Sequence, residues 1–246
     1  GKMSPDERKV QGAAINATST SGGGDGGSDD VTINATNSTL VGATGINAKN
    51  TGTDTLDEVL ITLSGTTTVE GTNGDGVHGE AVNSLLNFDT INTIKSANGD
   101  ALDLSTSGTG NVKVNGNGAL SVTAGTGDAM NLKSPSGSIT VGDVGAGYAG
   151  AMTVTGGNGI KAETGGGSIN IKTAAAGTVN GGANDGINAK VTGAAGGGIT
   201  INAAGAIGVS GDGVNGSGIY AEITNAANNN NISVTSTGDI YVETKG

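Results

Sequence analysis

Apolar residues along the chain follow a short pattern that recurs about every 29 residues. In each copy an aliphatic residue follows Gly or Ala, and a small or apolar residue comes two positions later. The aliphatic positions, called anchors below, are Ile15, Ile46, Val77, Leu102, Met130, Ile160, Ile187 and Ile219. The residue between the two apolar positions is mostly polar. This period of two is typical of a β-strand and not of a helix.

Two further runs with strand-like alternation follow most anchors. The second runs lie at 31–33, 59–61, 91–94, 111–114, 138–141, 168–171, 198–201 and 232–234. The third runs are clearest late in the chain, at 119–122, 151–154, 178–179, 206–209 and 239–242. Gly, Asn, Asp and Ser are common between the runs, as expected for turns. Each repeat therefore predicts one coil of three short strands.

A single coil of this kind cannot bury its apolar face, whereas stacked coils can, because each strand pairs in parallel with its equivalents above and below. We therefore predict an all-β fold, a right-handed parallel β-helix (β-solenoid) of about eight coils. This explains why the segment 45–49, Gly-Ile-Asn-Ala-Lys, recurs at 186–190. Low-complexity disorder and another or left-handed solenoid are the alternatives.

Composition narrows the classes of protein that fit. The chain has 246 residues, of which 49 are Gly, and it has no Cys or Trp. A net charge of −11 argues against nucleic acid and anionic membranes as partners. No apolar run reaches the length of a membrane span, so direct membrane insertion is not expected. We expect residues 1–12 to be a tag remnant, a cap or a disordered tail, and residues 13–246 to be a single β-helix domain.

Segments such as "NGDGVHGEAVN", "GNGIKAETGGGSINIKTAAAGTVNGG" and "GSGIYAEITN" resemble the passenger regions of bacterial autotransporters (type V secretion). They are also similar to filamentous-haemagglutinin-like exoproteins. The resemblance spans nearly the whole chain. It lies in the glycine-rich repeats, the acidic balance and the lack of Cys, since no single motif carries it. It implies a right-handed parallel β-helix exposed on the cell surface (outer membrane) of a Gram-negative bacterium, or secreted, and many members are adhesins. "GKMSPDERKV" has no apolar core of a signal peptide, so we expect a fragment of a longer exported protein.

An enzyme is a weaker hypothesis. Some parallel β-helices cleave polysaccharides, but aromatic platforms for sugars are nearly absent here. The single histidine, His78, lies at an outward position beside Asp75 and Glu80. A Ser-His-Asp triad is conceivable on paper, yet no nucleophile motif of the GDSG or GxSxG type is present. A solvated surface histidine is the simpler interpretation, and no catalytic residue is predicted.

A polar residue stands two positions before most anchors, and three of these residues are Asp75, Asp100 and Asp128. Stacked in adjacent coils, these carboxylates repel one another unless they are paired, so Ca²⁺ is a candidate ligand. The simpler interpretation is turn chemistry, in which Asp and Asn side chains accept backbone N–H groups. No other cofactor is expected.

Long inserts between runs are the candidate contacts with a partner, because inserted residues leave the stack as loops. The candidate residues are Asp25, Asp29, Asp30, Tyr148 and Asp212. For Tyr148, a ring folded back onto the coil is the alternative. Asn residues at 228–231 are expected to be structural.

The sequence thus favours a non-catalytic adhesin rod that binds a host-cell surface or extracellular-matrix protein, or that self-associates, as in biofilm formation. A spacer stalk that presents another region is the second hypothesis, and a polysaccharide-active enzyme is the third.

Overall fold

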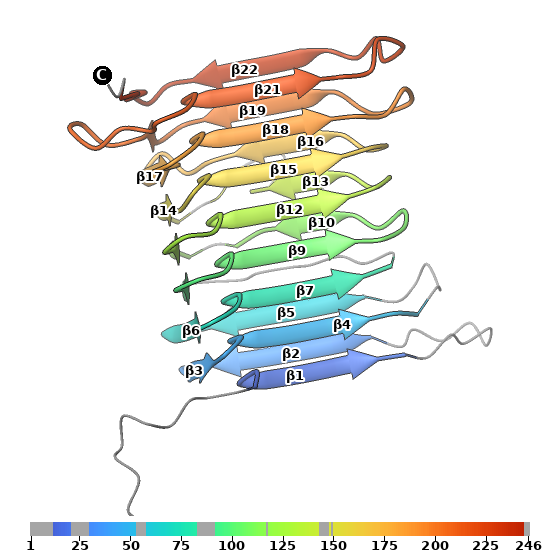
Figure 1. Ribbon diagram of the computed structural model, residues 1–246, viewed down its shortest axis with the longest axis vertical. Helices are drawn as coiled ribbons and strands as arrows, with labels where there is room; N and C mark the ends of the chain where they lie inside the picture. Colours follow the sequence, from blue (N-terminus) through green and yellow to red (C-terminus); the bar gives the residue numbers. More distant parts are fainter. Residues whose placement is uncertain are drawn as a thin grey trace, which may run out of the picture.

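The chain winds into a stack of parallel β-strands, as the computed structural model shows for residues 12–20, 30–52, 58–82, 92–116, 118–142, 148 and 150–243. These described residues contain strands, turns and bends but no helix. Strands in front run one way, strands behind run the other way, and each circuit rises by one step (Figure 1). Since the nearer strands run to the right, the more distant ones run to the left and the chain rises, the path is right-handed (Figure 1). The predicted parallel β-solenoid is therefore confirmed.

The longest face of the solenoid, sheet A, has eight strands. They are β1 (Ile15–Ser19), β4 (Ile46–Asn50), β7 (Val77–Ala81), β9 (Leu102–Thr106), β12 (Met130–Ser134), β15 (Ile160–Thr164), β18 (Ile187–Val191) and β21 (Ile219–Ile223). Every anchor pairs with the next anchor, from Ile15 with Ile46 to Ile187 with Ile219. Eight strands make about seven full turns, slightly fewer than the eight coils predicted.

The opposite face is divided between sheets B and D. Sheet B contains β2 (Val31–Thr36) and β5 (Val59–Ser64). Sheet D contains β10 (Val112–Val114), β13 (Ile139–Val141), β16 (Ile169–Lys172), β19 (Ile199–Ala203) and β22 (Ile232–Ser236). All pairs are parallel, and each of these strands coincides with a predicted second run.

A third face, sheet C, closes the cross-section of the coil. Its strands are β3 (Thr39–Gly42), β6 (Thr67–Gly71), β8 (Asn92–Ser96), β11 (Leu120–Ala124), β14 (Met152–Thr155), β17 (Gly177–Asn180) and β20 (Ala206–Ile207). One assignment from the sequence was wrong. The run at 91–94 was taken as a second-face strand, but β8 pairs with β6 and β11 and so belongs to the third face.

The core is a set of inward columns that run along the solenoid axis. Six of the eight anchors, Ile46 to Ile187, have no exposed surface, and the residues two positions after them line a second buried column. A third column is polar at one corner, where Thr106 and Ser134 are hydrogen-bonded to each other and to the carbonyl of Gly110. These buried hydroxyls therefore keep partners.

Small residues before the anchors allow neighbouring coils to approach closely. A Cβ added at Gly159 would lie 2.5 Å from the carbonyl oxygen of Gly186 and 2.6 Å from Val179 Cγ1. This close approach of the backbone explains why Gly or Ala stands before each anchor.

The last described coil is open on one side. Ile232, Val234 and Val242 are 44%, 46% and 51% exposed. Their partners one coil below, Ile199, Ile201 and Val214, are buried. Each strand in this coil has a neighbour below only, so its inward side chains are covered from one direction.

Candidate functional site

A ladder of side chains links successive coils at the corner before sheet A. Within this corner ladder, Oδ1 of one residue accepts the backbone N–H of the equivalent residue in the next coil. The bonds are Asp100 N to Asp75 (2.9 Å), Asp128 N to Asp100 (2.7 Å), Asn158 N to Asp128 (2.8 Å), Asp185 N to Asn158 (3.1 Å) and Ser217 N to Asp185 (2.7 Å).

The corner ladder corrects the turn-chemistry interpretation of these aspartates. Turn chemistry was expected within one coil, but the acceptor reaches the coil above, so the bond joins coils. The remaining oxygen of Asp100 accepts Asn131 Nδ2, and that of Asp128 faces Lys161 Nζ at 3.3 Å. Asp75, Asp100 and Asp128 therefore do not converge on one shared calcium site.

The outer face of sheet A carries two columns of polar side chains. The first column, one residue after each anchor, is Asn16, Asn47, His78, Asp103, Asn131, Lys161, Asn188 and Tyr220. The second column, three residues after each anchor, includes Lys49, Glu80, Ser105, Lys133, Glu163, Lys190 and Glu222. In the second column positive and negative charges mostly alternate.

Ion pairs form within the second column between adjacent coils. Lys49 Nζ lies 2.8 Å from Glu80 Oε2, and Lys190 Nζ lies 3.6 Å from Glu222 Oε2. Each pair is more than a third exposed and contributes less than about 1 kcal/mol. Sequence reasoning missed this alternation, although the residues three positions after the anchors display it directly.

His78 lies where the first column meets the corner ladder. Its Nδ1 is 2.9 Å from Asp103 Oδ2, one coil above, and 3.3 Å from Asp75 Oδ2, three residues before it. Its Nε2 is 3.9 Å from Glu80 Oε2. The side chain is 28% exposed, so the ring is neither a core residue nor the freely solvated one that the sequence suggested.

Hydrogen bonds to Asp103 and then Asp75 raise the pKa of His78 to about 10, against partial burial, which lowers it. The ring is thus an imidazolium at neutral pH. Burial raises the pKa of Asp100 nearby, and hydrogen bonds from the Asp128 N–H and the Asn131 amide oppose this shift. Among the described residues, the side-chain contacts of His78 are with carboxylates and not with a serine hydroxyl, so these residues do not form the triad considered from sequence.

A shallow groove follows the corner where the strands of sheet A end. It has a volume of about 680 Å³ and spans four coils. Its lining consists of Ser105, Thr106, Lys133, Ser134, Pro135, Glu163, Gly165 and Thr192. We call this feature the corner groove. It is as large as many ligand sites, but it is open along its length and lined by hydroxyls and two charged groups.

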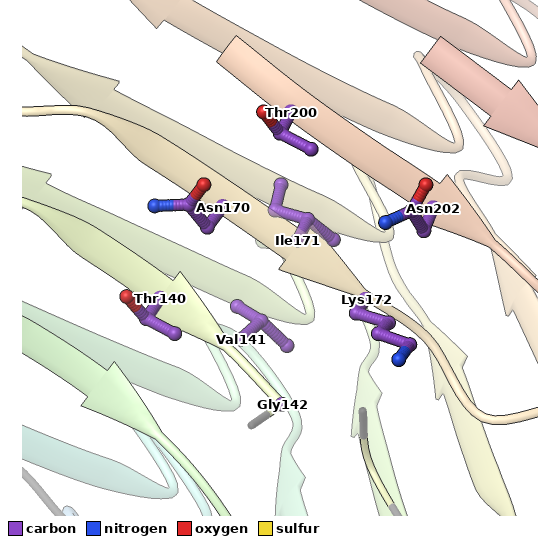
Figure 2. Close-up of a pocket in the computed structure, with 8 residues that line it drawn as sticks. All are labelled: Thr140, Val141, Gly142, Asn170, Ile171, Lys172, Thr200 and Asn202. Atoms are coloured by element: carbon purple, nitrogen blue, oxygen red, sulfur yellow. The ribbon is translucent and has the colours of Figure 1, made fainter. Parts of the chain in front are cut away.

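A second hollow lies on sheet D and is much smaller. Figure 2 shows Thr140, Asn170 and Thr200 in one row and Lys172 with Asn202 in the next, while Gly142 contributes no side chain below Lys172. The resulting volume is about 40 Å³, enough for a water molecule or two but not for an organic ligand.

The predicted loop contacts have different outcomes. Asp25 and Asp29 lie outside the described residues. Asp30 and Asp212 are exposed, and Asp30 Oδ1 accepts the N–H of Glu58 at 2.9 Å, so it also joins two coils. Tyr148 is 3% exposed, which is the folded-back alternative, and its ring is not a surface contact.

The asparagine run fastens one turn to the turn below. Asn228 Nδ2 donates to the carbonyl of Gly193 at 3.2 Å, and Asn230 Nδ2 donates to the carbonyl of Gly196 at 2.8 Å. The run is therefore structural, as expected.

Comparisons with protein-family models, with curated proteins and with solved structures give no match for this chain. In the part of the chain that the structure describes, no helix is long and apolar enough to cross a membrane.

Proposed function

We propose that this protein is a non-catalytic interaction rod, exposed on the cell surface or secreted by a Gram-negative bacterium, that attaches to a host-cell or extracellular-matrix protein. The observation that carries the proposal is the corner groove, an open depression that runs across four successive coils. The resemblance of the glycine-rich repeats to autotransporter passenger regions supports the export and display of such a rod.

The shape of the corner groove suits an extended partner. Four coils spaced about 4.8 Å apart give a contact about 15 Å long, which matches an extended peptide segment or a short glycan better than a compact small molecule. The hydroxyls of Ser105 and Thr192, which are partly exposed, offer both donors and acceptors along it. Lys133 and Glu163, which pair in register in adjacent strands, place opposite charges side by side.

Weak contacts of this kind gain strength by repetition. Alternating charges contribute to orientation and selectivity more than to affinity, and a surface that displays many rods multiplies weak contacts. A second copy of the rod is a further possible partner, because an alternating column is complementary to a shifted or inverted copy of itself.

The test compares two charge reversals in the corner groove with two matched reversals elsewhere. Lys133→Glu and Glu163→Lys alter the groove, while Lys95→Glu and Glu70→Lys alter an equivalent register pair on sheet C. The purified chain is assayed for binding to cultured cells and immobilised matrix proteins, and for self-association by sedimentation. We expect the groove variants to weaken binding at least about tenfold, with the sheet C variants near wild type.

Each alternative predicts a different result. A spacer stalk binds neither cells, matrix proteins nor itself, and that outcome refutes the proposal. Self-association that the groove variants abolish moves the partner from the host to a second copy. Cleavage of a polysaccharide by the purified chain favours the enzyme hypothesis.

A further inference from the structure

Three potential metal ligands from two adjacent coils converge at the only histidine of the chain. His78 and Asp75 belong to the coil of β7, and Asp103 lies on β9 above it. One donor atom from each residue lies within 4.8 Å of the other two. Two of these ligands are on sheet strands and the third is fixed in the corner ladder, so the set rests on the rigid part of the solenoid.

The distances from His78 Nδ1 to the two carboxylate oxygens match those between neighbouring ligands of a single transition-metal ion. Two ligands bound at about 2.1 Å lie about 3.0 Å apart in octahedral geometry and about 3.4 Å apart in tetrahedral geometry. His78 Nδ1 is 2.9 Å from Asp103 Oδ2 and 3.3 Å from Asp75 Oδ2. An ion can therefore replace the shared proton with little movement of the three side chains.

Each carboxylate is oriented by its other oxygen. Asp75 Oδ1 accepts the N–H of Asp100 at 2.9 Å, and Asp103 Oδ1 accepts Nδ2 of Asn131 at 3.1 Å. Both residues are thus left with Oδ2 directed at the imidazole. Groups that orient metal ligands through such hydrogen bonds are typical of metal sites.

Asn131 supplies a separate indication. The residue is 7% exposed, its Nδ2 points at the carboxylates of Asp100 and Asp103, and its Oδ1 has no hydrogen-bond partner among the described residues. An unpaired buried carbonyl costs about 1–3 kcal/mol. The amide therefore orients both carboxylates, while its own carbonyl has no partner among the described residues.

We propose that His78 Nδ1, Asp75 Oδ2 and Asp103 Oδ2 bind one divalent transition-metal ion, with Zn²⁺ as the expected ion and Co²⁺ as a spectroscopic substitute. One imidazole and two carboxylates neutralise a divalent ion, and imidazole favours Zn²⁺ over Ca²⁺. The side chains of these ligands are 20–28% exposed, which leaves the outer coordination positions to water. The bound ion joins the coils of β7 and β9.

The coil of β18 offers a matched control. Asp185 and Asn188 occupy the positions equivalent to Asp75 and His78, and Asn188 Nδ2 donates to Asp185 Oδ2 at 2.7 Å. Asp185→Asn removes a corner-ladder carboxylate without touching the proposed ligands. His78→Gln and Asp103→Asn remove ligands and retain polar side chains of similar size.

The experiment is a titration of the untagged chain, freed of metal with a chelator, with Zn²⁺ by calorimetry and with Co²⁺ by visible absorption. We expect saturable binding of one ion per chain below about 1 mM. His78→Gln and Asp103→Asn should weaken binding at least about 30-fold, and Asp185→Asn should leave it unchanged. The Co²⁺ bands and the NMR signals of the single imidazole should change together.

Three results overturn the proposal. One is the absence of saturable Zn²⁺ binding below about 1 mM. Another is equal Zn²⁺ affinity in wild type and His78→Gln, once circular dichroism has shown both to be folded. The third is Ca²⁺ binding that is tighter than Zn²⁺ binding and insensitive to His78→Gln, which would assign the site to oxygen ligands alone.

Discussion

Removing one carboxylate of the corner ladder tests whether the ladder stabilises the stack. Asp128 is the most informative position because its side chain is only 13% exposed and makes three contacts. Oδ1 accepts the backbone N–H of Asn158 at 2.8 Å and its Nδ2 at 2.7 Å, while Oδ2 lies 3.3 Å from Lys161 Nζ. Asp128→Ala removes all three and leaves two donors of the buried Asn158 without an acceptor.

The expected loss follows from those contacts. A hydrogen bond to a charged acceptor contributes about 1.5–3 kcal/mol, and the partly exposed lysine pair contributes less than about 1 kcal/mol. Because the two bonds to Asn158 share one acceptor atom, we expect a total of about 3 kcal/mol and not their sum. Asp128→Asn keeps an acceptor oxygen, so its free energy of unfolding should fall by only about 1 kcal/mol.

Denaturant unfolding measures the loss, and hydrogen exchange at the Asn158 amide locates it. Local exchange is needed because stacked repeats can unfold in parts, so one global free energy is an incomplete readout. The control is Asp212→Ala, which removes an exposed carboxylate and should lie within about 0.5 kcal/mol of wild type. A change this small for Asp128→Ala, with the Asn158 amide still protected, would refute the reasoning.

Three further predictions rest on other parts of the stack. The NMR titration of the single imidazole should give a pKa of about 10. The stability that the charged His78 contributes should be complete below about pH 6.5 and should be lost between about pH 6.5 and 10, by about 2 kcal/mol after solvent screening. His78→Gln should not show this pH dependence of stability. Ile160→Ala should lower the free energy of unfolding by about 4 kcal/mol, since its side chain has no exposed surface, and an unchanged denaturation midpoint would contradict this. Lys190→Glu should cost less than about 1 kcal/mol, and adding Glu222→Lys should restore most of it in a double-mutant cycle.

The sequence was sufficient to predict the register of sheet A. Anchor residues such as Ile160 and Ile187 lie opposite each other because the aliphatic side chain, the small residue before it and the apolar residue after it recur as a unit. A buried column needs all three features in every coil, so their joint recurrence predicts which residues lie opposite each other.

Assignment of single runs to faces was less secure. The run at 91–94 has the alternation of any half-buried strand, and only its pairing with β6 and β11 places it on sheet C. The coil that contains it is the shortest, with 25 residues between Val77 and Leu102. Apolar alternation reports that a strand has one buried side but not which neighbour it pairs with.

The candidate metal centre could be predicted from the sequence only in part. His78 and Asp103 each follow an anchor by one residue, so the predicted register already placed them in adjacent coils. The sequence did not predict which contact each of the two oxygens of a carboxylate makes. Asp75 uses Oδ1 to accept the N–H of Asp100 and presents Oδ2 to the imidazole, whereas Asp128 presents its second oxygen to a lysine. Aspartate at this position of the repeat therefore bonds to the next coil at Asp75, Asp100, Asp128 and Asp185, and it acquires the proposed ligand-binding geometry only where the first column supplies a histidine.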